Sequence, residues 1–223
     1  MSPFGLSGRA GSVTTVSERV VLCYGDSNTY GWDSETGGRF PPEVRWPGVL
    51  AAELGSGWRV VEEGLGGRTT VHDDPLMPHR NGLTYLAPCL CSHAPLDAVV
   101  LFLGTNDLKP RFGLPAGDVA RGIGVLIEHV LASGAGPDWR APSVVVLGLP
   151  RLGRFDAADE QFDGVAAKWE RLPGLLRRMT EEFGVGFVDL GDTTAYSDVD
   201  ARHLDRAGHA AVGRAAAHAV RRS

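Results

Sequence analysis

The sequence is short of cysteine and lacks the cysteine and histidine spacings of common metal sites. Its three cysteines are Cys23, Cys89 and Cys91. Cys89 and Cys91 are too close for an easy disulfide, and they lack the two-residue spacer of a redox motif. Cys23 lies in an apolar run, so we expect it to be a buried strand residue. This cysteine usage predicts a reduced, cytoplasmic setting.

Long apolar runs and long basic runs are also missing. No apolar segment is long enough to cross a membrane, so we expect no membrane partner. The formal net charge is −5, from 22 basic and 27 acidic residues, and without a basic run or zinc-finger spacing we expect no nucleic-acid partner. Residues 1–18 are rich in Gly, Ser and Thr and have no apolar signal region, which predicts a flexible tail.

The sequence does contain short apolar runs that alternate with segments of helical character. The predicted strands are residues 20–24, 58–61, 98–103, 143–149 and 185–190, and the predicted helices are residues 46–54, 116–132, 164–183 and 205–220. The central strands are continuous Val, Leu and Phe runs, as burial on both faces requires. Residues 31–42 and 70–81 are expected loops. The pattern predicts one α/β domain over residues 19–223, a three-layer sandwich with a parallel sheet.

Gly25-Asp26-Ser27 follows the first predicted strand directly. A serine on a strand-to-helix turn is exposed at the sheet edge, and a helix N-terminus stabilises developing negative charge there. The same tripeptide is also a common turn, and Ser and Asp are common helix caps. Position 29 is Thr, so the G-x-S-x-G elbow of α/β-hydrolases is absent.

Two further turns follow the second and third predicted strands. The glycine-rich residues 63–70 expose backbone N–H groups that suit an oxyanion or a phosphate. No Lys-Ser/Thr follows them and a third glycine is missing, which excludes a P-loop and a dinucleotide fingerprint. After the third strand, the side-chain amide of Asn106 either donates into the crevice or serves an ordinary turn.

Asp200 and His203 lie just before the last predicted helix. A serine hydroxyl is un-ionised at neutral pH, and an imidazole can take its proton and return it to a leaving group. A carboxylate three residues upstream can bond the other ring nitrogen and set its tautomer, with Asp198 as a second candidate. We expect Asp205 to cap the last helix and His209 to be an ordinary helix residue.

Together these segments resemble the blocks of the SGNH, or GDSL-type, serine hydrolases, from about residue 19 to the end. The resemblance is greatest to the bacterial arylesterase/acyltransferase branch, whose members also perform perhydrolysis. It rests on residues 23–32, 44–46, 62–65, 68–70 and 103–107. The resemblance implies the flavodoxin-like SGNH hydrolase fold with a five-stranded parallel sheet.

The resemblance also implies roles for individual residues. Ser27 is the expected nucleophile, and Asp200 and His203 complete a catalytic triad. The implied oxyanion donors are the N–H groups of Ser27 and Gly67 and the Asn106 side chain, with Gly66 as an alternative to Gly67. Members of this branch assemble into oligomers, so we expect a homo-oligomer.

The substrate pocket is the least defined part of the prediction. We expect it to include Asn28, Trp32, Arg68 and Asp107. The aromatic residues Tyr30, Trp32, Phe40 and Trp46 either form an apolar wall that favours small or aromatic esters or belong to the core. Residues 151–163 match no pattern and are candidates for shaping the acyl pocket.

The predicted function is hydrolysis of small aryl or short-chain acyl esters through an acyl-serine, with acyltransferase or perhydrolase side activity. Deacetylation of a carbohydrate or natural product is the alternative within the same family. A non-catalytic small-molecule-binding module, with Ser27 as a helix cap, is the alternative of another class. The expected partner is a small ester, and no cofactor or metal is expected, because the histidines lack ligand spacing such as H-E-x-x-H.

Overall fold

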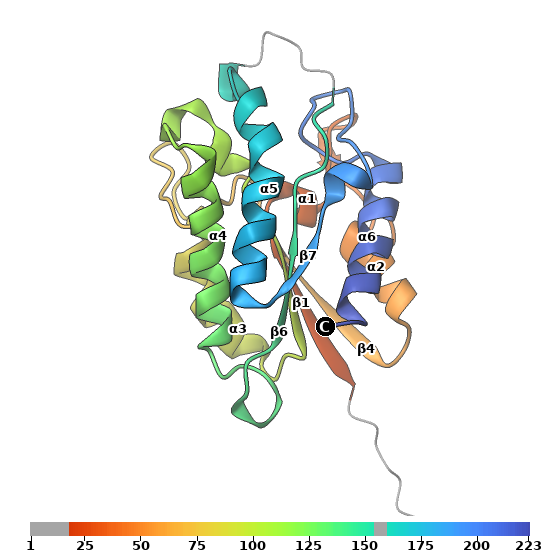
Figure 1. Ribbon diagram of the computed structural model, residues 1–223. Helices are drawn as coiled ribbons and strands as arrows, with labels where there is room; N and C mark the ends of the chain where they lie inside the picture. The colour runs from red at the N-terminus through yellow and green to blue at the C-terminus, as the bar shows by residue number, and fades with distance from the viewer. Residues whose placement is uncertain (1–17, 154–159) are drawn as a thin grey trace, which may run out of the picture.

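The computed structural model describes residues 18–153 and 160–223. Strands and helices alternate along the chain (Figure 1). The strands are β1 (Arg19–Gly25), β2 (Trp32–Asp33), β3 (Gly38–Arg39), β4 (Trp58–Gly64), β5 (Ala98–Phe102), β6 (Ser143–Leu147) and β7 (Gly186–Val188). The α-helices are α1 (Ser27–Tyr30), α2 (Trp46–Leu54), α3 (Gly82–His93), α4 (Ala116–Leu131), α5 (Ala166–Phe183) and α6 (Arg206–Val220).

Five parallel strands form the main sheet, in the order β4-β1-β5-β6-β7. This is the flavodoxin-like order, in which the chain direction across the sheet reverses between the first strand and the third. Here the reversal falls between β1 and β5. Open sheets of this kind place their ligand crevice outside the carboxyl ends of those two strands.

Helices cover both faces of the sheet, as Figure 1 shows, with α3, α4 and α5 on one side and α2 and α6 on the other. The three central strands, β1, β5 and β6, are almost completely shielded from water except at their first residues in β1 and β6, whereas the edge strands β4 and β7 are partly exposed. Such burial explains why the central strands show no alternation of polar and apolar residues. The predicted three-layer α/β/α fold with a five-stranded parallel sheet is confirmed.

The predicted elements agree with the observed ones within a few residues at each end. The predicted loop at residues 31–42 holds the short antiparallel pair of β2 and β3. The sequence did not predict α3. This helix contains Pro88 and begins at a glycine, and both features normally argue against a helix interior or start. Asn81, the last residue of the predicted loop at 70–81, caps it by accepting the N–H of Thr84.

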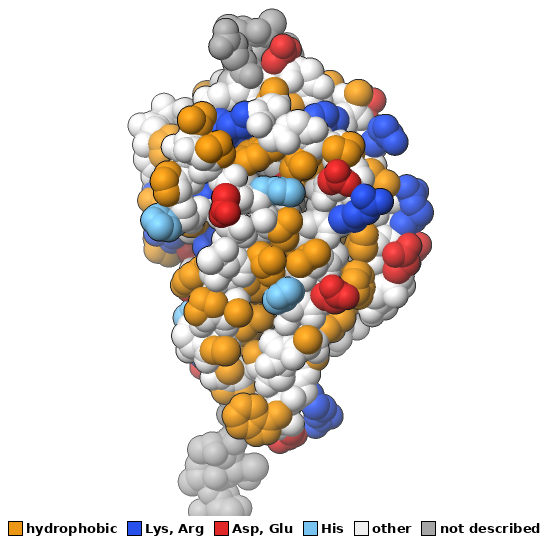
Figure 2. Space-filling view, turned by 90° about the vertical axis from the view of Figure 1, so that its left-hand side faces the viewer, with side chains coloured by type: hydrophobic (Ala, Val, Ile, Leu, Met, Phe, Trp, Pro, Cys, Tyr) orange, Lys and Arg blue, Asp and Glu red, His pale blue; other side chains and the backbone are white. Residues whose placement is uncertain are grey.

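The side of the molecule on which α3 and α4 lie faces the viewer in Figure 2. Apolar side chains on this face are interspersed with histidines and with acidic and basic side chains. Within residues 18–153 and 160–223, no helix is both long and apolar enough to span a membrane.

The contact between α2 and α6 corrects the prediction for His209. The side chain is completely buried, and its Nδ1 accepts the backbone N–H of Trp46 at 3.2 Å. Phe40 packs edge-on against the imidazole. Asp205 caps α6 as predicted, by accepting the N–H of Gly208 at 2.7 Å. His209 is therefore a neutral core residue that joins two helices.

We predict that His209 makes the protein less stable in acid. Burial, and after it the charges of His203 and Arg45, lower the pKa of His209 to about 3 from 6.5. The unfolded chain therefore binds a proton that the folded chain excludes, so stability is complete above pH 6.5 and falls as the pH drops below it. Between pH 7.5 and 5.5 the loss is about 1.4 kcal/mol.

Urea unfolding of wild type and of His209→Asn at the two pH values measures this loss. Asn keeps an acceptor for the Trp46 N–H, and the variant should lose about 1.4 kcal/mol less than wild type over the same interval. His129→Asn, on the exposed face of α4, should behave as wild type. Equal pH dependence in all three proteins would contradict the assignment.

Candidate active site

The turn that carries Ser27 leaves the sheet at the end of β1. Gly25 is the last strand residue, and a Cβ there would lie 2.0 Å from Thr29 Oγ1. Only glycine therefore permits the strand and the helix to approach this closely. Asp26 caps α1, because its carboxylate accepts the N–H of Asn28 at 2.9 Å. Ser27 is left half-buried at the first position of the helix.

Ser27, His203 and Asp200 lie in a hydrogen-bonded series. Ser27 Oγ is 2.8 Å from His203 Nε2, and His203 Nδ1 is 2.5 Å from Asp200 Oδ2. Because an ionised carboxylate only accepts, Nδ1 carries the hydrogen and the lone pair of Nε2 faces the serine hydroxyl. The structure thus brings together the three residues of the predicted triad, although Ser27 and His203 are 176 positions apart.

The surroundings of Asp200 keep it charged. Burial by itself raises the pKa of Asp200, but the hydrogen bond from His203 and the charge of the imidazole outweigh burial and lower the pKa below its ordinary value. Asp200 also accepts the backbone N–H of His203 at 3.1 Å. A carboxylate held in this way is ready to stabilise positive charge on the imidazole.

Asn28 anchors the loop that carries His203. Its Nδ2 donates to the carbonyl oxygen of Arg202 at 3.1 Å, and its Oδ1 accepts the N–H of Leu204 at 2.9 Å. These two bonds flank His203 on either side in the sequence. Asn28 is 1% exposed, so water does not compete for either bond.

The candidate oxyanion donors come from three turns. Asn106 follows β5, and its Nδ2 donates to the Arg68 carbonyl oxygen at 3.0 Å. Gly67 has a φ of 80°, in the left-handed region that favours glycine, whereas Gly66 does not. Among the residues that the structure describes, none accepts a hydrogen bond from the backbone N–H of Ser27 or of Gly67.

Three of the four predicted pocket residues are buried, and their place in the substrate pocket stays a prediction. Asn28, Arg68 and Asp107 are 1%, 3% and 0% exposed. Asn28 holds the His203 loop, and Arg68 lies 4.2 Å over the ring of Tyr24. Asp107 accepts the N–H and the hydroxyl of Thr70 at 2.9 and 2.5 Å. Their polar groups join turns of the site to one another, and Arg68 donates to the carbonyl oxygen of Gly25 at 2.9 Å.

Trp32, the fourth predicted pocket residue, is exposed beside the imidazole. Its side chain is 37% exposed, and its ring centroid lies 6.2 Å from that of His203. Phe40 and Trp46 are buried, so the core interpretation holds for these two aromatic residues. Tyr30 is half-buried. The predicted aromatic wall therefore reduces to Trp32 at the position next to the triad.

Lys109 lies close to this site without having been predicted there. It is 6% exposed and follows the short turn that Asn106 begins. Burial, and then the charge of Arg111, lower the pKa of Lys109 to about 8, whereas Asp74 and Asp26 act in the opposite direction. The sequence signal that could have placed Lys109 at the site was its position three residues after Asn106. Because lysines are mostly surface residues, that position alone did not indicate a buried lysine.

The segment 151–163 is described only in part, because residues 154–159 lie outside the described residues. Phe162 is buried, with its ring 5.7 Å from Lys109 Nζ and 5.1 Å from Arg202 Cζ. This end of the segment therefore lies beside the loop that carries His203. The prediction that 151–163 shapes the acyl pocket stays a prediction.

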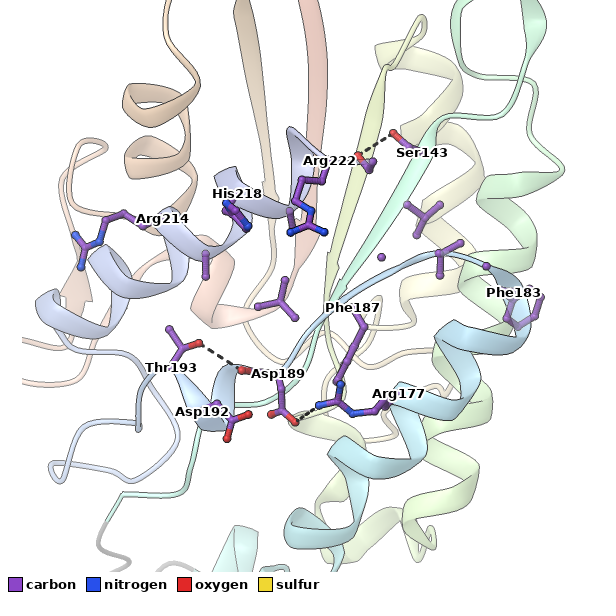
Figure 3. Close-up of a pocket in the computed structure, with 18 of the residues that line it drawn as sticks. Ser143, Arg177, Phe183, Phe187, Asp189, Asp192, Thr193, Arg214, His218 and Arg222 are labelled. Atoms are coloured by element: carbon purple, nitrogen blue, oxygen red, sulfur yellow. Dashed lines mark hydrogen bonds and ion pairs between the residues drawn. The ribbon is translucent and has the colours of Figure 1, made fainter.

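A large cavity lies elsewhere, over the edge strand β7 between α5 and α6 (Figure 3). Its volume is about 1330 Å³, and no member of the predicted triad lines it. Arg177 and Asp189 form an ion pair of 3.1 Å along its wall, and Ser143 is bonded to Ser223 (Figure 3). No serine there is bonded to the lining histidine, His218, so the cavity has no counterpart of the Ser27–His203 pair.

Comparison with known proteins agrees with this arrangement. The model of the GDSL-like Lipase/Acylhydrolase family matches residues 23–211. Among curated proteins, none matches the chain.

Several solved structures are similar over nearly the whole chain. The aryl esterase of M. smegmatis is 40% identical with a TM-score of 0.86, covering 92% of this chain and 99% of that one. Est24, a carbohydrate acetylesterase from Sinorhizobium meliloti, is 39% identical with a TM-score of 0.87 and the same coverage. A putative arylesterase from Agrobacterium tumefaciens str. C58 is 40% identical with a TM-score of 0.86, again with that coverage.

The family match, the similarity to arylesterases and carbohydrate acetylesterases, and the shared three-layer fold agree with one another. The chain therefore belongs to the GDSL-like lipase/acylhydrolase family, close to its arylesterase branch, and is a carboxylic ester hydrolase.

Proposed function

We propose that the chain is a serine esterase that hydrolyses small aryl or short-chain acyl esters through an acyl-Ser27 intermediate. The observation that carries the proposal is the series Ser27 Oγ, His203 imidazole and Asp200 carboxylate, with separations of 2.8 and 2.5 Å. A serine hydroxyl at this distance from a correctly tautomerised imidazole can transfer its proton as it attacks. The similarity to arylesterases supports the choice of substrate class.

In the proposed mechanism, His203 Nε2 takes the hydroxyl proton while Ser27 Oγ bonds to the ester carbonyl carbon. The carbonyl oxygen becomes an oxyanion, and the N–H groups of Ser27 and Gly67 and the amide of Asn106 stabilise its charge. His203 then returns the proton to the alcohol or phenol as the C–O bond breaks. Asp200 stabilises the imidazolium throughout. Water, or another nucleophile, releases the acyl group by the reverse sequence.

Carbohydrate deacetylation is the second candidate, because a carbohydrate acetylesterase is 39% identical over almost the full length. The two substrates present the same acetyl group and differ in the leaving alcohol. Turnover of aryl acetates measured beside turnover of acetylated sugars separates them. We further propose that Trp32 contacts the leaving group, since it is the exposed aromatic side chain next to His203.

Covalent labelling tests the role of Ser27 as the nucleophile. A fluorophosphonate should add once per chain, as measured by intact mass, and the adduct should map to Ser27, because only an activated serine reacts stoichiometrically. Ser27→Ala should lose both the adduct and p-nitrophenyl acetate turnover. Ser92→Ala, an exposed serine on α3, should keep both. A folded wild-type protein with neither adduct nor turnover would contradict the proposal and favour the binding module, in which Ser27 is only the first residue of α1.

Kinetics of an Asn106 variant test its proposed role as an oxyanion donor. Asn106→Ala should lower kcat about 10²–10³-fold, or roughly 3–4 kcal/mol, because one oxyanion donor is removed. KM should change little, since the donor acts mainly on the charge of the transition state. Steady-state kinetics measure both values, and a thermal melt confirms that the variant is folded. Unchanged kcat in a folded variant would remove Asn106 from the mechanism.

Two matched variants test whether Asp200 or Asp198 is the carboxylate that orients His203. Asp200→Asn should reduce kcat on the order of 10³–10⁴-fold, because an amide favours the wrong imidazole tautomer. Asp198→Asn should have a much smaller effect, since the short contact of His203 Nδ1 is to Asp200. Kinetics of the two variants side by side provide the measurement. A severe loss in Asp198→Asn with a mild one in Asp200→Asn would reverse the assignment.

A further inference from the structure

A second cluster of reactive side chains lies between β4 and α3. Glu63, Cys89 and His93 each offer one donor atom, and these atoms lie within 4.8 Å of one another. Glu63 Oε1 is 2.9 Å from His93 Nε2. Among the described residues, no other His, Cys, Asp or Glu side chains form a group of three that meets this distance. The cluster takes no part in the proposed esterase mechanism.

The fold explains why these three residues meet. Side chains alternate along a strand, so Glu62 and Glu63 of β4 point to opposite faces of the sheet. Glu62 pairs with Arg45 beside α2, and Glu63 pairs with His93 on α3. Cys89 and His93 are four residues apart on α3, which places them on the same face of the helix.

We propose that Glu63, Cys89 and His93 bind a divalent transition-metal ion of the zinc class. Zinc lies about 2.3 Å from sulfur and about 2.0–2.2 Å from nitrogen and oxygen, which sets tetrahedral donor atoms about 3.3–3.6 Å apart. The donor atoms of the observed group lie within 4.8 Å of one another, close to these separations. The Glu63–His93 contact opens by a few tenths of an ångström to admit the ion.

The donor set selects the class of metal. A thiolate and an imidazole are ligands of Zn²⁺ and Co²⁺, whereas Ca²⁺ and Mg²⁺ take oxygen donors. The thiolate and the carboxylate together balance the two positive charges of the ion. The completed site therefore carries no net charge, and the proton that the Cys89 thiol loses when it binds the ion passes to solvent.

An ion has access to the cluster from one side. Glu63 and His93 are partly exposed, whereas Cys89 is completely buried behind them. Glu63 also lines a cavity of about 460 Å³ together with Arg68, Asn81 and Tyr85. A water molecule in this cavity is the natural fourth ligand. The oxygen and nitrogen donors thus face solvent, and the oxidisable sulfur is protected.

Other uses of Cys89 fit the structure less well. Cys89 is completely buried, so its thiol is not accessible to external electrophiles, as a nucleophilic or redox role would require. Cys91 is exposed and lies two residues along the same helix, which turns it away from Cys89. An ion pair of Glu63 and His93 alone does not explain a sulfur atom within reach of both.

The proposal is tested by titrating the full-length, chelator-treated protein with Co²⁺ and recording its absorption spectrum. One equivalent should bind and produce both the near-ultraviolet thiolate-to-cobalt band and the visible bands of a tetrahedral ion. Cys89→Ser should abolish the thiolate band, and Cys91→Ser should keep it. Zn²⁺ should displace the bound Co²⁺. His93→Gln should weaken Co²⁺ binding at least tenfold.

The controls separate this site from the esterase residues. Ser27→Ala should bind Co²⁺ as wild type does, because Ser27 lies outside the cluster. Binding without a thiolate band, a band that follows Cys91, or no binding at all would overturn the proposal. If Cys89→Ser does not fold, His93→Gln and Glu63→Gln test it instead, since both side chains are partly exposed and should tolerate the change. Cobalt affinity unchanged in both would also overturn it.

Discussion

The geometry of the candidate active site depends on the side-chain amide of Asn28. Its two hydrogen bonds, to Arg202 and to Leu204, hold the backbone on both sides of His203 against the helix that begins with Ser27. The loop that carries His203 is not relaxed, because Ala201, the residue before Arg202, has a φ of 60°, a conformation that costs a non-glycine residue about 1–2 kcal/mol. Buried amide bonds of this kind can offset such a cost, since no water competes for them.

The sheet order determines which turns can meet at this place. The chain reverses direction across the sheet between β1 and β5, so the turns after these two neighbouring strands flank one crevice. Ser27 follows β1, and Asn106 follows β5. The turn after β4, on the other side of β1, supplies Gly67 and receives the Asn106 amide on the Arg68 carbonyl. Neighbouring parallel strands thus deliver three candidate oxyanion donors without any long-range loop.

Local sequence was sufficient to predict the parts of the molecule whose structure follows from the residue pattern of one segment. Short apolar runs, continuous in the central strands, predicted all five strands of the sheet, and the four motifs with the family resemblance predicted the residues at its edge. The same reasoning failed where packing between distant segments decides. Arg68 and Asp107 have the polar character of binding residues, and local sequence did not show that they bond to other turns of the site. His209 has no signal of burial in its own helix, because α2 covers it.

Different surroundings of Asp26, Asp107 and Asp200 explain why Asp200 alone stabilises positive charge on the His203 imidazole. Burial raises the pKa of Asp26, and it raises the pKa of Asp107 to about 7, so both carboxyl groups resist ionisation. Only Asp200 of these three has a lowered pKa, because His203 donates to it directly. When His203 accepts the serine proton, the positive imidazolium is therefore balanced by Asp200, whose Oδ2 lies 2.5 Å from His203 Nδ1. In the proposed mechanism, the favourable direction for the proton is from Ser27 toward the imidazole that Asp200 stabilises.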